Sequence, residues 1–196
     1  MRGGNTSPRD GAEATPEQTN PVRTAGPVRG REKPKEIIVG FFNQVELMEV
    51  KGTKVMIASP HPLYRALTNP AVLMQTMPGL KQLQSQGLGT YAAEMEMGVA
   101  SIRGRYHGIL HIQETRPPEA YRLSLNGRGP AGTIQMVMEV GLEPQGSATA
   151  LHYLGKASME GKVAGLGQKL LDGVAHLVLT QFFSGIEEYL HGHPPS

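Results

Sequence analysis

Residues 134–142 read Ile-Gln-Met-Val-Met-Glu-Val-Gly-Leu, so every second position from Ile134 to Leu142 carries an apolar side chain. Successive side chains of a β-strand point to opposite faces of the sheet. This period of two therefore predicts a strand that buries one face and leaves the other against solvent. The buried face of this strand would consist of methionines and aliphatic side chains.

Four further stretches on either side of this strand repeat the alternation. Their expected inward-facing residues are Tyr91, Ala93, Met95, Met97 and Val99 in 91–99; Ile102, Tyr106, Leu110 and Ile112 in 102–112; Tyr121, Leu123 and Leu125 in 121–125; and Leu151, Tyr153, Ala157 and Met159 in 151–159. The connections are short and rich in Pro and Gly, and we expect Gly127 to Gly132 to form one flexible hairpin turn. Short connections join antiparallel neighbours, so the stretches predict one antiparallel sheet.

One amphipathic helix is expected to close the chain, from Ala164 to Leu190. Its apolar stripe at helical spacing would consist of Leu166, Leu170, Leu171, Val174, Leu177, Val178, Gln181 and Phe182. A helix with such a stripe must pack on another apolar surface, and the apolar face of the sheet provides one. The predicted fold class is therefore α+β, with a curved antiparallel sheet around one long C-terminal helix. A sheet curved in this way can enclose a pocket.

The segment ahead of the main sheet adds a strand and two short helices. Strand patterns lie near Val45–Val50 and Thr53–Ala58, either as two strands or as one that is interrupted. The helices are expected at Leu63–Leu67 and Ala71–Thr76, and Ser59 is the expected N-cap of the first. Both helices would lie in the connection between the first strand and the main sheet.

The first 35 residues differ in composition from the rest of the chain. They hold five Pro, five Gly and no aromatic residue, which is typical of a disordered tail. They also carry seven Arg or Lys against four acidic residues, which leaves 12 basic and 13 acidic residues for the remainder. We therefore expect a basic tail at 1–35, a nearly neutral domain at 36–190 and a polar end at 191–196. A nearly neutral domain argues against nucleic-acid binding.

Residues 36–42 form an apolar stretch, which is interpreted as an additional edge strand or a docking segment. Three absences elsewhere in the sequence limit the expected chemistry and location. The chain has no cysteine, which excludes disulfides and thiolate chemistry. No apolar run reaches the roughly 18 residues of a membrane-spanning helix, and the start of the chain lacks the apolar region of a secretory signal. The expected location is the cytoplasm.

The polar residues of the strands do not form a catalytic or metal site. His107 and His111 are four residues apart, but in a strand that separation is about 13 Å, too far for a shared metal ion. Glu94 and Glu96 are expected to point outward, whereas acid–base catalysis needs them in a pocket. The sequence also contains no nucleophile elbow, phosphate-binding loop or metalloprotease helix. We therefore expect no catalytic residue and no bound metal.

Four runs of residues lie in a characteristic order along the chain. They are Ala66–Leu73 with Met77–Gly79; Gly98–Gly108; Pro117-Pro118 with Tyr121, Leu123, Gly127 and Gly129–Gly132; and Gly161–Leu171 with Phe182-Phe183. Together they resemble the family of carbon monoxide dehydrogenase G subunits, over about residues 44–190. The order and spacing of the runs carry the resemblance. Thr76 and Lys169 depart from the family pattern, which commonly has Cys and Arg there.

The resemblance implies a fold and a role. The family is part of the Bet v 1-like helix-grip superfamily, also called START-like or SRPBCC. Its members are accessory to molybdenum hydroxylases of the carbon monoxide dehydrogenase type. The resemblance implies that the chain recruits such an enzyme to the inner face of the cell membrane, or carries a quinone between the two. It implies no catalysis by the chain itself and no covalent cofactor.

The inward-facing Met and Tyr residues form the candidate ligand site. Met side chains adapt to flexible apolar ligands, and an inward Tyr hydroxyl can hydrogen-bond the carbonyl of a quinone head. The residues expected to bind a quinone or lipid are Tyr91, Met95, Met97, Tyr106, Leu110, Leu123, Met136, Met138, Tyr153, Met159, Leu170, Val174 and Phe182. One alternative is a filled core in an assembly factor for the same hydroxylase. Another is a START-like cyclase, which would need an inward polar pair where the sequence offers only tyrosines.

Overall fold

The computed structural model describes residues 45–99 and 102–193. The elements in chain order are β1 (Val45–Met56), α1 (Pro60–Thr68), α2 (Pro70–Thr76), β2 (Leu80–Gly87), β3 (Thr90–Met97), β4 (Gly104–Arg116), β5 (Ala120–Gly129), β6 (Gly132–Gln145), β7 (Ala148–Glu160), the 3-10 helix η2 (Lys162–Leu166) and α3 (Gln168–Gly192). The tail predicted at 1–35 and the segment 36–42 lie outside the described residues. No described helix is long and apolar enough to span a membrane.

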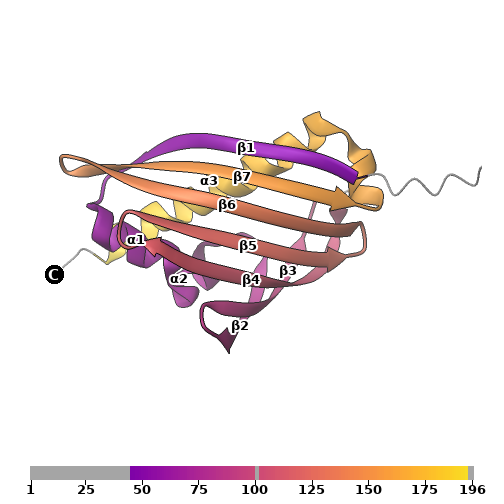
Figure 1. Cartoon of the computed structure of the whole chain (residues 1–196), viewed down its shortest axis with the longest axis horizontal. Helices are drawn as coiled ribbons and strands as arrows, with labels where there is room; N and C mark the ends of the chain where they lie inside the picture. Colours follow the sequence, from indigo (N-terminus) through magenta and orange to yellow (C-terminus); the bar gives the residue numbers. More distant parts are fainter. Residues whose placement is uncertain (1–44, 100–101, 194–196) are drawn as a thin grey trace, which may run out of the picture. The chain divides into compact units, whose positions relative to one another are not determined.

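The strands form one antiparallel sheet in the order β1-β7-β6-β5-β4-β3-β2, as Figure 1 shows. The predicted antiparallel arrangement is therefore confirmed. β1 is a single strand of 12 residues that pairs with β7 along its whole length. Gly52 does not interrupt this strand. A side chain at Gly52 would overlap the ring of Tyr153 on the neighbouring strand, so close packing explains the glycine.

The edge strand β2 was not expected from the sequence. Its residues, Leu-Lys-Gln-Leu-Gln-Ser-Gln-Gly, include only Leu80 and Leu83 as apolar side chains, and they are three positions apart. The strand pairs with β3 on one side and is exposed over most of its length. A solvated edge strand needs no period-two apolar pattern, so the sequence carried no signal for it.

The predicted hairpin turn from Gly127 to Gly132 is shorter than expected. Gly127 pairs with Ile134, and Gly129 pairs with Gly132, so both glycines belong to the β5–β6 ladder. Only residues 130 and 131 lie between the two strands. β4 similarly begins at Gly104, so Ile102, which is buried, precedes the strand rather than forming part of it.

The long helix begins later and ends later than predicted. Gly167 has a φ of 79°, which ends η2 and delays the start of α3 to Gln168. α3 then continues to Gly192, and the ring of His193 stacks on Tyr189, so the expected polar end at 191–196 begins within ordered structure. The predicted apolar stripe is also partly wrong. The buried residues of α3 are Leu171, Phe182, Phe183 and Ile186, whereas Leu170, Leu177 and Gln181 are exposed.

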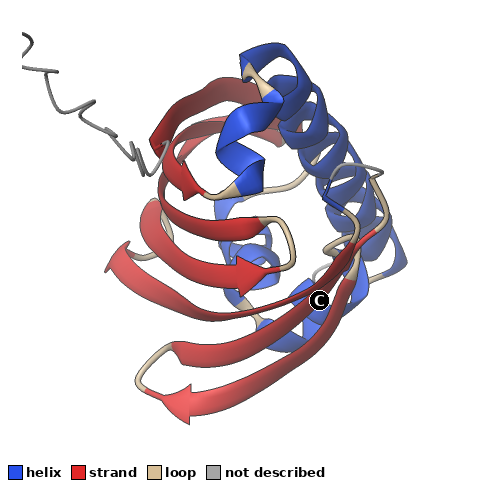
Figure 2. Cartoon of the chain, turned by 90° about the vertical axis from the view of Figure 1, so that its right-hand side faces the viewer, coloured by secondary structure: helices blue, strands red, loops and turns tan. Residues whose placement is uncertain are grey.

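All three α-helices lie on the concave side of the sheet, as Figure 2 shows. The core sits at one end of this concave face, where α1, α2 and the second half of α3 meet the sheet. It consists of Met56, Leu63, Tyr64, Ala66, Leu67, Val72, Leu73, Ile112, Tyr121, Val140, Leu142, Leu151, Phe182, Phe183 and Ile186. Ile186 is fully buried within it. The helices predicted at Leu63–Leu67 and Ala71–Thr76 are thus confirmed; α1 extends beyond the prediction at both ends, and α2 begins one residue earlier.

The caps of the two short helices differ and give a direct stability prediction. The side-chain oxygen of Asn69 accepts a hydrogen bond of 2.9 Å from the backbone N–H of Ala71, at the start of α2. Ser59 precedes α1 but makes no such side-chain bond. We expect Asn69→Ala to lower the free energy of unfolding by about 1 kcal/mol, and Ser59→Ala to change it by less than about 0.5 kcal/mol. Urea denaturation of both variants tests this, and equal losses would contradict it.

Candidate functional site

The concave face is less well filled beneath the first half of α3 than at the core. β7 ends at Glu160, and α3 returns over the sheet from Gln168, so the start of the helix lies over the end of β7. Several inward-facing apolar residues at this end are only half-buried, including Met97, Tyr106, Ile134, Met136 and Val174. At the core end, by contrast, the inward face includes buried residues such as Leu151, against which other half-buried side chains pack. This half-buried end of the concave face is called the hollow below.

Glycines on the inward face let large side chains lie flat against the sheet. The ring of Tyr106 lies where a side chain at Gly129 would project. The terminal methyl group of Met138 would similarly lie 3.0 Å from a Cβ at Gly155. Side chains that lie flat do not project toward the helix, so these glycines leave room above the sheet. Gly is the residue that permits such close approach.

An open, shallow surface cavity of about 540 Å³ is lined by the residues where η2 passes into α3. The lining residues are Leu166, Gly167, Gln168, Lys169 and Leu170. These residues are consecutive in the chain and mostly exposed, so the depression does not enclose a ligand by itself. The cavity lies at the same end of the domain as the hollow, because η2 contacts β1, β6 and β7.

The thirteen predicted ligand-binding residues fall into four groups. Phe182 belongs to the packed core, and five half-buried residues pack against it, namely Tyr91, Leu110, Leu123, Met138 and Tyr153. Met159 is buried, and Leu170 is 39% exposed. The remaining five are half-buried outside the core cluster and make up the predicted part of the hollow: Met95, Met97, Tyr106, Met136 and Val174. Leu170 does not face inward as predicted, although it lines the cavity at the start of α3.

The inward tyrosines differ in how their hydroxyl groups are used. Tyr106 donates a hydrogen bond of 3.0 Å to the backbone oxygen of Ile102, which leaves its oxygen lone pairs available as acceptors. The ring of Tyr153 packs on Phe183 with centroids 5.6 Å apart. The hydroxyls of Tyr91 and Tyr153 make no hydrogen bond to another described residue. Tyr91 and Tyr153 can therefore donate to a ligand carbonyl without losing an existing bond.

Two buried tyrosines at the core end were not among the predicted ligand-binding residues. The rings of Tyr64 and Tyr121 meet edge to face, with centroids 5.9 Å apart. Burial raises the pKa of Tyr121 far above its usual value, and the nearby Tyr64 adds to this. Burial and the charge of Glu114 also raise the pKa of Tyr64. Tyr121 lay within the predicted alternation, but the position of Tyr64 on a short helix gave no signal of this pairing.

The hydroxyl of Tyr64 is buried and has no hydrogen-bond partner among the described residues. A buried polar atom without a partner is costly, so Tyr64→Phe should raise the free energy of unfolding by about 1 kcal/mol. Tyr106→Phe is the matched control, because it removes a hydroxyl that does make a bond, and it should lower stability by a similar amount. Urea denaturation measures both. A loss of stability in Tyr64→Phe as large as that in Tyr106→Phe would contradict this prediction.

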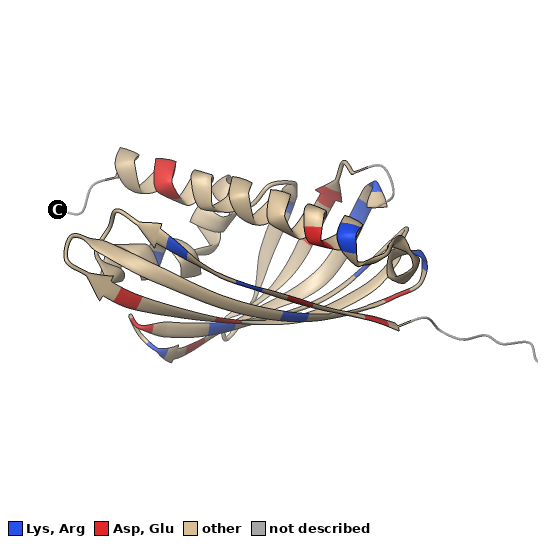
Figure 3. Cartoon of the chain, turned by 90° about the horizontal axis from the view of Figure 1, so that it is seen from above, with Lys and Arg blue, Asp and Glu red and all other residues tan. Residues whose placement is uncertain are grey.

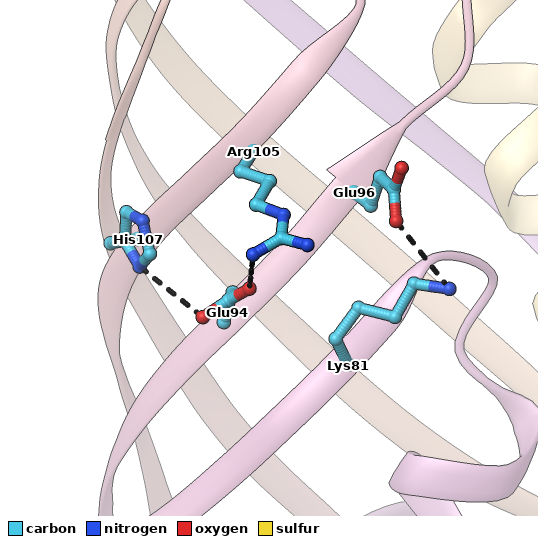
Figure 4. A network of polar contacts seen from close by, with 5 residues as sticks. All are labelled: Lys81, Glu94, Glu96, Arg105 and His107. Atoms are coloured by element: carbon cyan, nitrogen blue, oxygen red, sulfur yellow. Dashed lines mark ion pairs between the residues drawn. The ribbon is translucent and has the colours of Figure 1, made fainter.

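The convex face of the sheet carries several ion pairs. Figure 4 shows Glu94 between Arg105 and His107, at 3.6 Å and 3.7 Å, and Glu96 beside Lys81 at 3.6 Å. Both glutamates point outward, as predicted, and His107 lies in a strand.

A shallow depression of about 410 Å³ also opens on the convex face, with Arg122, Glu139 and His152 among its lining residues. Arg122 and Glu139 form an ion pair there. His152 lies 3.2 Å from Glu143 and 2.9 Å from the hydroxyl of Thr53. These side chains are largely exposed, so they lack the water-excluding setting that strengthens catalytic contacts.

A START-like cyclase would need a polar pair on the inward face, so the neighbours of Tyr106 are relevant to that alternative. Met95 is its cross-strand neighbour on β3, and Gly129 lies beneath its ring on β5; neither can exchange a proton. Among the described residues, charged side chains of the inward face lie in two places away from Tyr106. Lys54 on the edge strand β1 pairs with Glu187 at 2.9 Å, and Glu114 lies near Tyr64 at the core end. The hollow as described can therefore hold an apolar group and hydrogen-bond its polar end.

The sequence and the fold both agree with one known family. The family model for CoxG, the G subunit of carbon monoxide dehydrogenase, matches residues 52–191, which is most of the chain. The chain belongs to the CoxG family. The resemblance found in the four sequence runs is thus confirmed, and it covers the sheet and the long helix of this CoxG protein. A search of curated proteins finds no matching sequence.

Several solved structures of other proteins have a similar fold. A conserved protein from Geobacillus kaustophilus has 29% sequence identity and a TM-score of 0.72, over 74% of this chain and 96% of that one. A START superfamily protein from Mycobacterium smegmatis has 12% identity and a TM-score of 0.57, over 74% and 97% of the two chains. The protein Ara h 8.0201 has 13% identity and a TM-score of 0.54, over 75% and 99%. The START-like helix-grip fold expected for this CoxG protein is therefore confirmed.

Proposed function

We propose that this CoxG protein binds a quinone or lipid in the hollow, as a non-catalytic accessory to a molybdenum hydroxylase of the carbon monoxide dehydrogenase type. It would link that enzyme to the respiratory chain at the inner face of the cell membrane. The observation that carries the ligand proposal is the set of half-buried Met side chains and Tyr106 on the concave face, outside the packed core cluster. Membership of the CoxG family supports the accessory role.

The chemistry of the hollow suits a ligand with an apolar body and one polar group. Met95, Met97 and Met136 offer flexible, polarizable contacts that adapt to different shapes. Tyr91 and Tyr153, which pack against the core on the same concave face, carry hydroxyl groups that could donate to such a ligand. A quinone head presents ring carbonyls that accept such hydrogen bonds, and its isoprenoid tail is apolar. A lipid with a single carbonyl-bearing head would satisfy the same groups.

Tyrosine fluorescence tests ligand binding without a label. The chain has six Tyr and no Trp, so its intrinsic fluorescence arises from tyrosine alone. Titration with a short-tailed benzoquinone should quench part of this emission in a saturable manner, because Tyr106 lies in the hollow. Quenching that rises linearly without saturation would show that the quinone only collides with the protein. In that case organic extraction of the purified protein should yield a bound lipid, and an extract without lipid would overturn the ligand proposal.

Purification from the native host tests the accessory role separately. Subunits of a molybdenum hydroxylase should copurify with the tagged protein, and the interaction should survive removal of free quinone. An empty protein that retains the hydroxylase would favour the alternative of an assembly factor. A ligand-bound protein that retains no hydroxylase would instead overturn the accessory role and leave a carrier.

A further inference from the structure

β1 forms one edge of the sheet, and among the described residues no strand pairs with its outer side. Long strands with a free edge present unpaired N–H and C=O groups, and natural proteins usually protect them. β1 is instead 12 residues long and continuous, and it exposes apolar side chains on its convex face. Leu47 is 73% exposed, and Val45 and Val55 are each about half exposed. This edge is suited to pairing with another strand.

The charges of β1 are divided between its two halves. The first half carries Glu46 and Glu49, and the second half carries Lys51 and Lys54. Figure 3, viewed from the β1 side, shows acidic bands toward the start of this strand and basic bands toward its end. An antiparallel arrangement of two such strands brings the acidic half of one against the basic half of the other. The strand is therefore complementary in charge to a second copy of itself.

We propose that two copies of this protein pair through β1 as antiparallel strands, with a two-fold axis at Val50. In this register, Glu49 of each copy faces Lys51 of the second copy, and Val45 faces the second copy's Val55. On the concave side, Glu46 would face the second copy's Lys54, which also contacts Glu187 of its own chain. Glu49 and Lys51 of one chain pair with each other at 3.2 Å, but both side chains are exposed, so in the dimer each can pair with its counterpart in the second copy as well. The result is one sheet that continues across both copies.

The neighbouring registers are unfavourable, which fixes the proposed one. A shift by two residues in one direction places Glu49 directly opposite Glu49 of the second copy. The same shift in the other direction places Lys51 opposite Lys51. Like charges directly opposite each other destabilise a strand pair. A shift by one residue would place concave-facing side chains of one copy against convex-facing ones of the other.

Charge-swap variants test the proposal in the full chain. Glu49→Lys alone and Lys51→Glu alone each create two like-charge pairs across the axis, so each should weaken dimerisation by about tenfold in sedimentation equilibrium. An equimolar mixture of the two variants should form the mixed dimer, because both pairs are then opposite in charge. The double variant E49K/K51E should dimerise as well as the unmodified protein. An unmodified protein that stays monomeric throughout the micromolar range would overturn the proposal.

A cysteine cross-link tests the position of the axis. The chain has no cysteine, so a single introduced thiol can pair only with the same residue of another copy. Directly opposite residues of antiparallel strands have Cα atoms roughly 4.5–5.5 Å apart, within the range of a disulfide. Val50→Cys should therefore cross-link under mild oxidation. Leu47→Cys is the control, because it is more exposed but would lie about 20 Å from its counterpart. Cross-linking of Leu47→Cys but not Val50→Cys would overturn the proposed register.

Discussion

Gly132→Ala is expected to lower the free energy of unfolding by at least about 3 kcal/mol. Gly132 opens β6 with a φ of 132°, a conformation that side chains other than glycine's rarely adopt. A Cβ at this position would also overlap the backbone oxygen of Glu160, at the end of β7. Backbone atoms on both sides of this contact belong to paired strands and cannot yield easily. Urea denaturation followed by circular dichroism measures the loss.

Gly141→Ala is the matched control in the same strand. A Cβ at Gly141 would have no atom within 4 Å, and its φ is not positive. Alanine is favoured over glycine in a strand interior by roughly 0.5–1 kcal/mol, so this variant should be as stable as the original protein or slightly more so. Equal losses in Gly132→Ala and Gly141→Ala would show that the contact with Glu160 is unimportant.

Met136→Trp is expected to weaken ligand binding by at least about tenfold, which corresponds to about 1.4 kcal/mol. Met136 is half-buried on the inward face of β6, opposite Leu125 and Ala157 on the neighbouring strands. A larger side chain there would occupy space that the proposed ligand needs. Because the hollow is not tightly packed, we expect little loss of folding stability. Equilibrium dialysis with the benzoquinone measures the affinity.

Val137→Trp is the control for this prediction. Val137 is the next residue of the same strand, points to the convex face and is 43% exposed. The variant adds the same ring at the neighbouring position but on the other side of the sheet. It should bind the quinone as the original protein does. A similar loss of affinity in both variants would place the ligand outside the hollow or attribute the effect to the sheet as a whole.

The sheet could be predicted from sequence wherever one face is buried. The period of two in 134–142 and the four related stretches marks strands that contact the helices on one side only. The same principle explains why β2 was not predicted, because this strand buries only Leu80 and Leu83 in part and carries polar residues elsewhere. β1 was ambiguous for a different reason. Gly52 resembles an interruption in the sequence, and only its contact with Tyr153 explains its presence.

The site could be predicted less completely than the sheet. Inward-facing residues follow from alternation, but the degree of burial depends on where the helix lies over the sheet. The predicted stripe of α3 included Leu170 because the helix was expected to begin at Ala164. The same stripe included Leu171, which is buried, whereas Leu170 lies close to the break at Gly167 and is exposed. Tyr64 could not be found for a similar reason, since its contact with Tyr121 joins residues far apart in the chain.

Native mass spectrometry of the protein purified from its own host, followed by organic extraction, tests the central claim most directly. We expect a bound mass that is lost on denaturation, and a quinone or lipid in the extract. Protein carrying the Met136→Trp substitution should yield much less of the same compound, whereas Val137→Trp should yield a similar amount. Protein that is recovered empty, with no quinone or lipid in the extract, would contradict the proposal that the hollow is a ligand site.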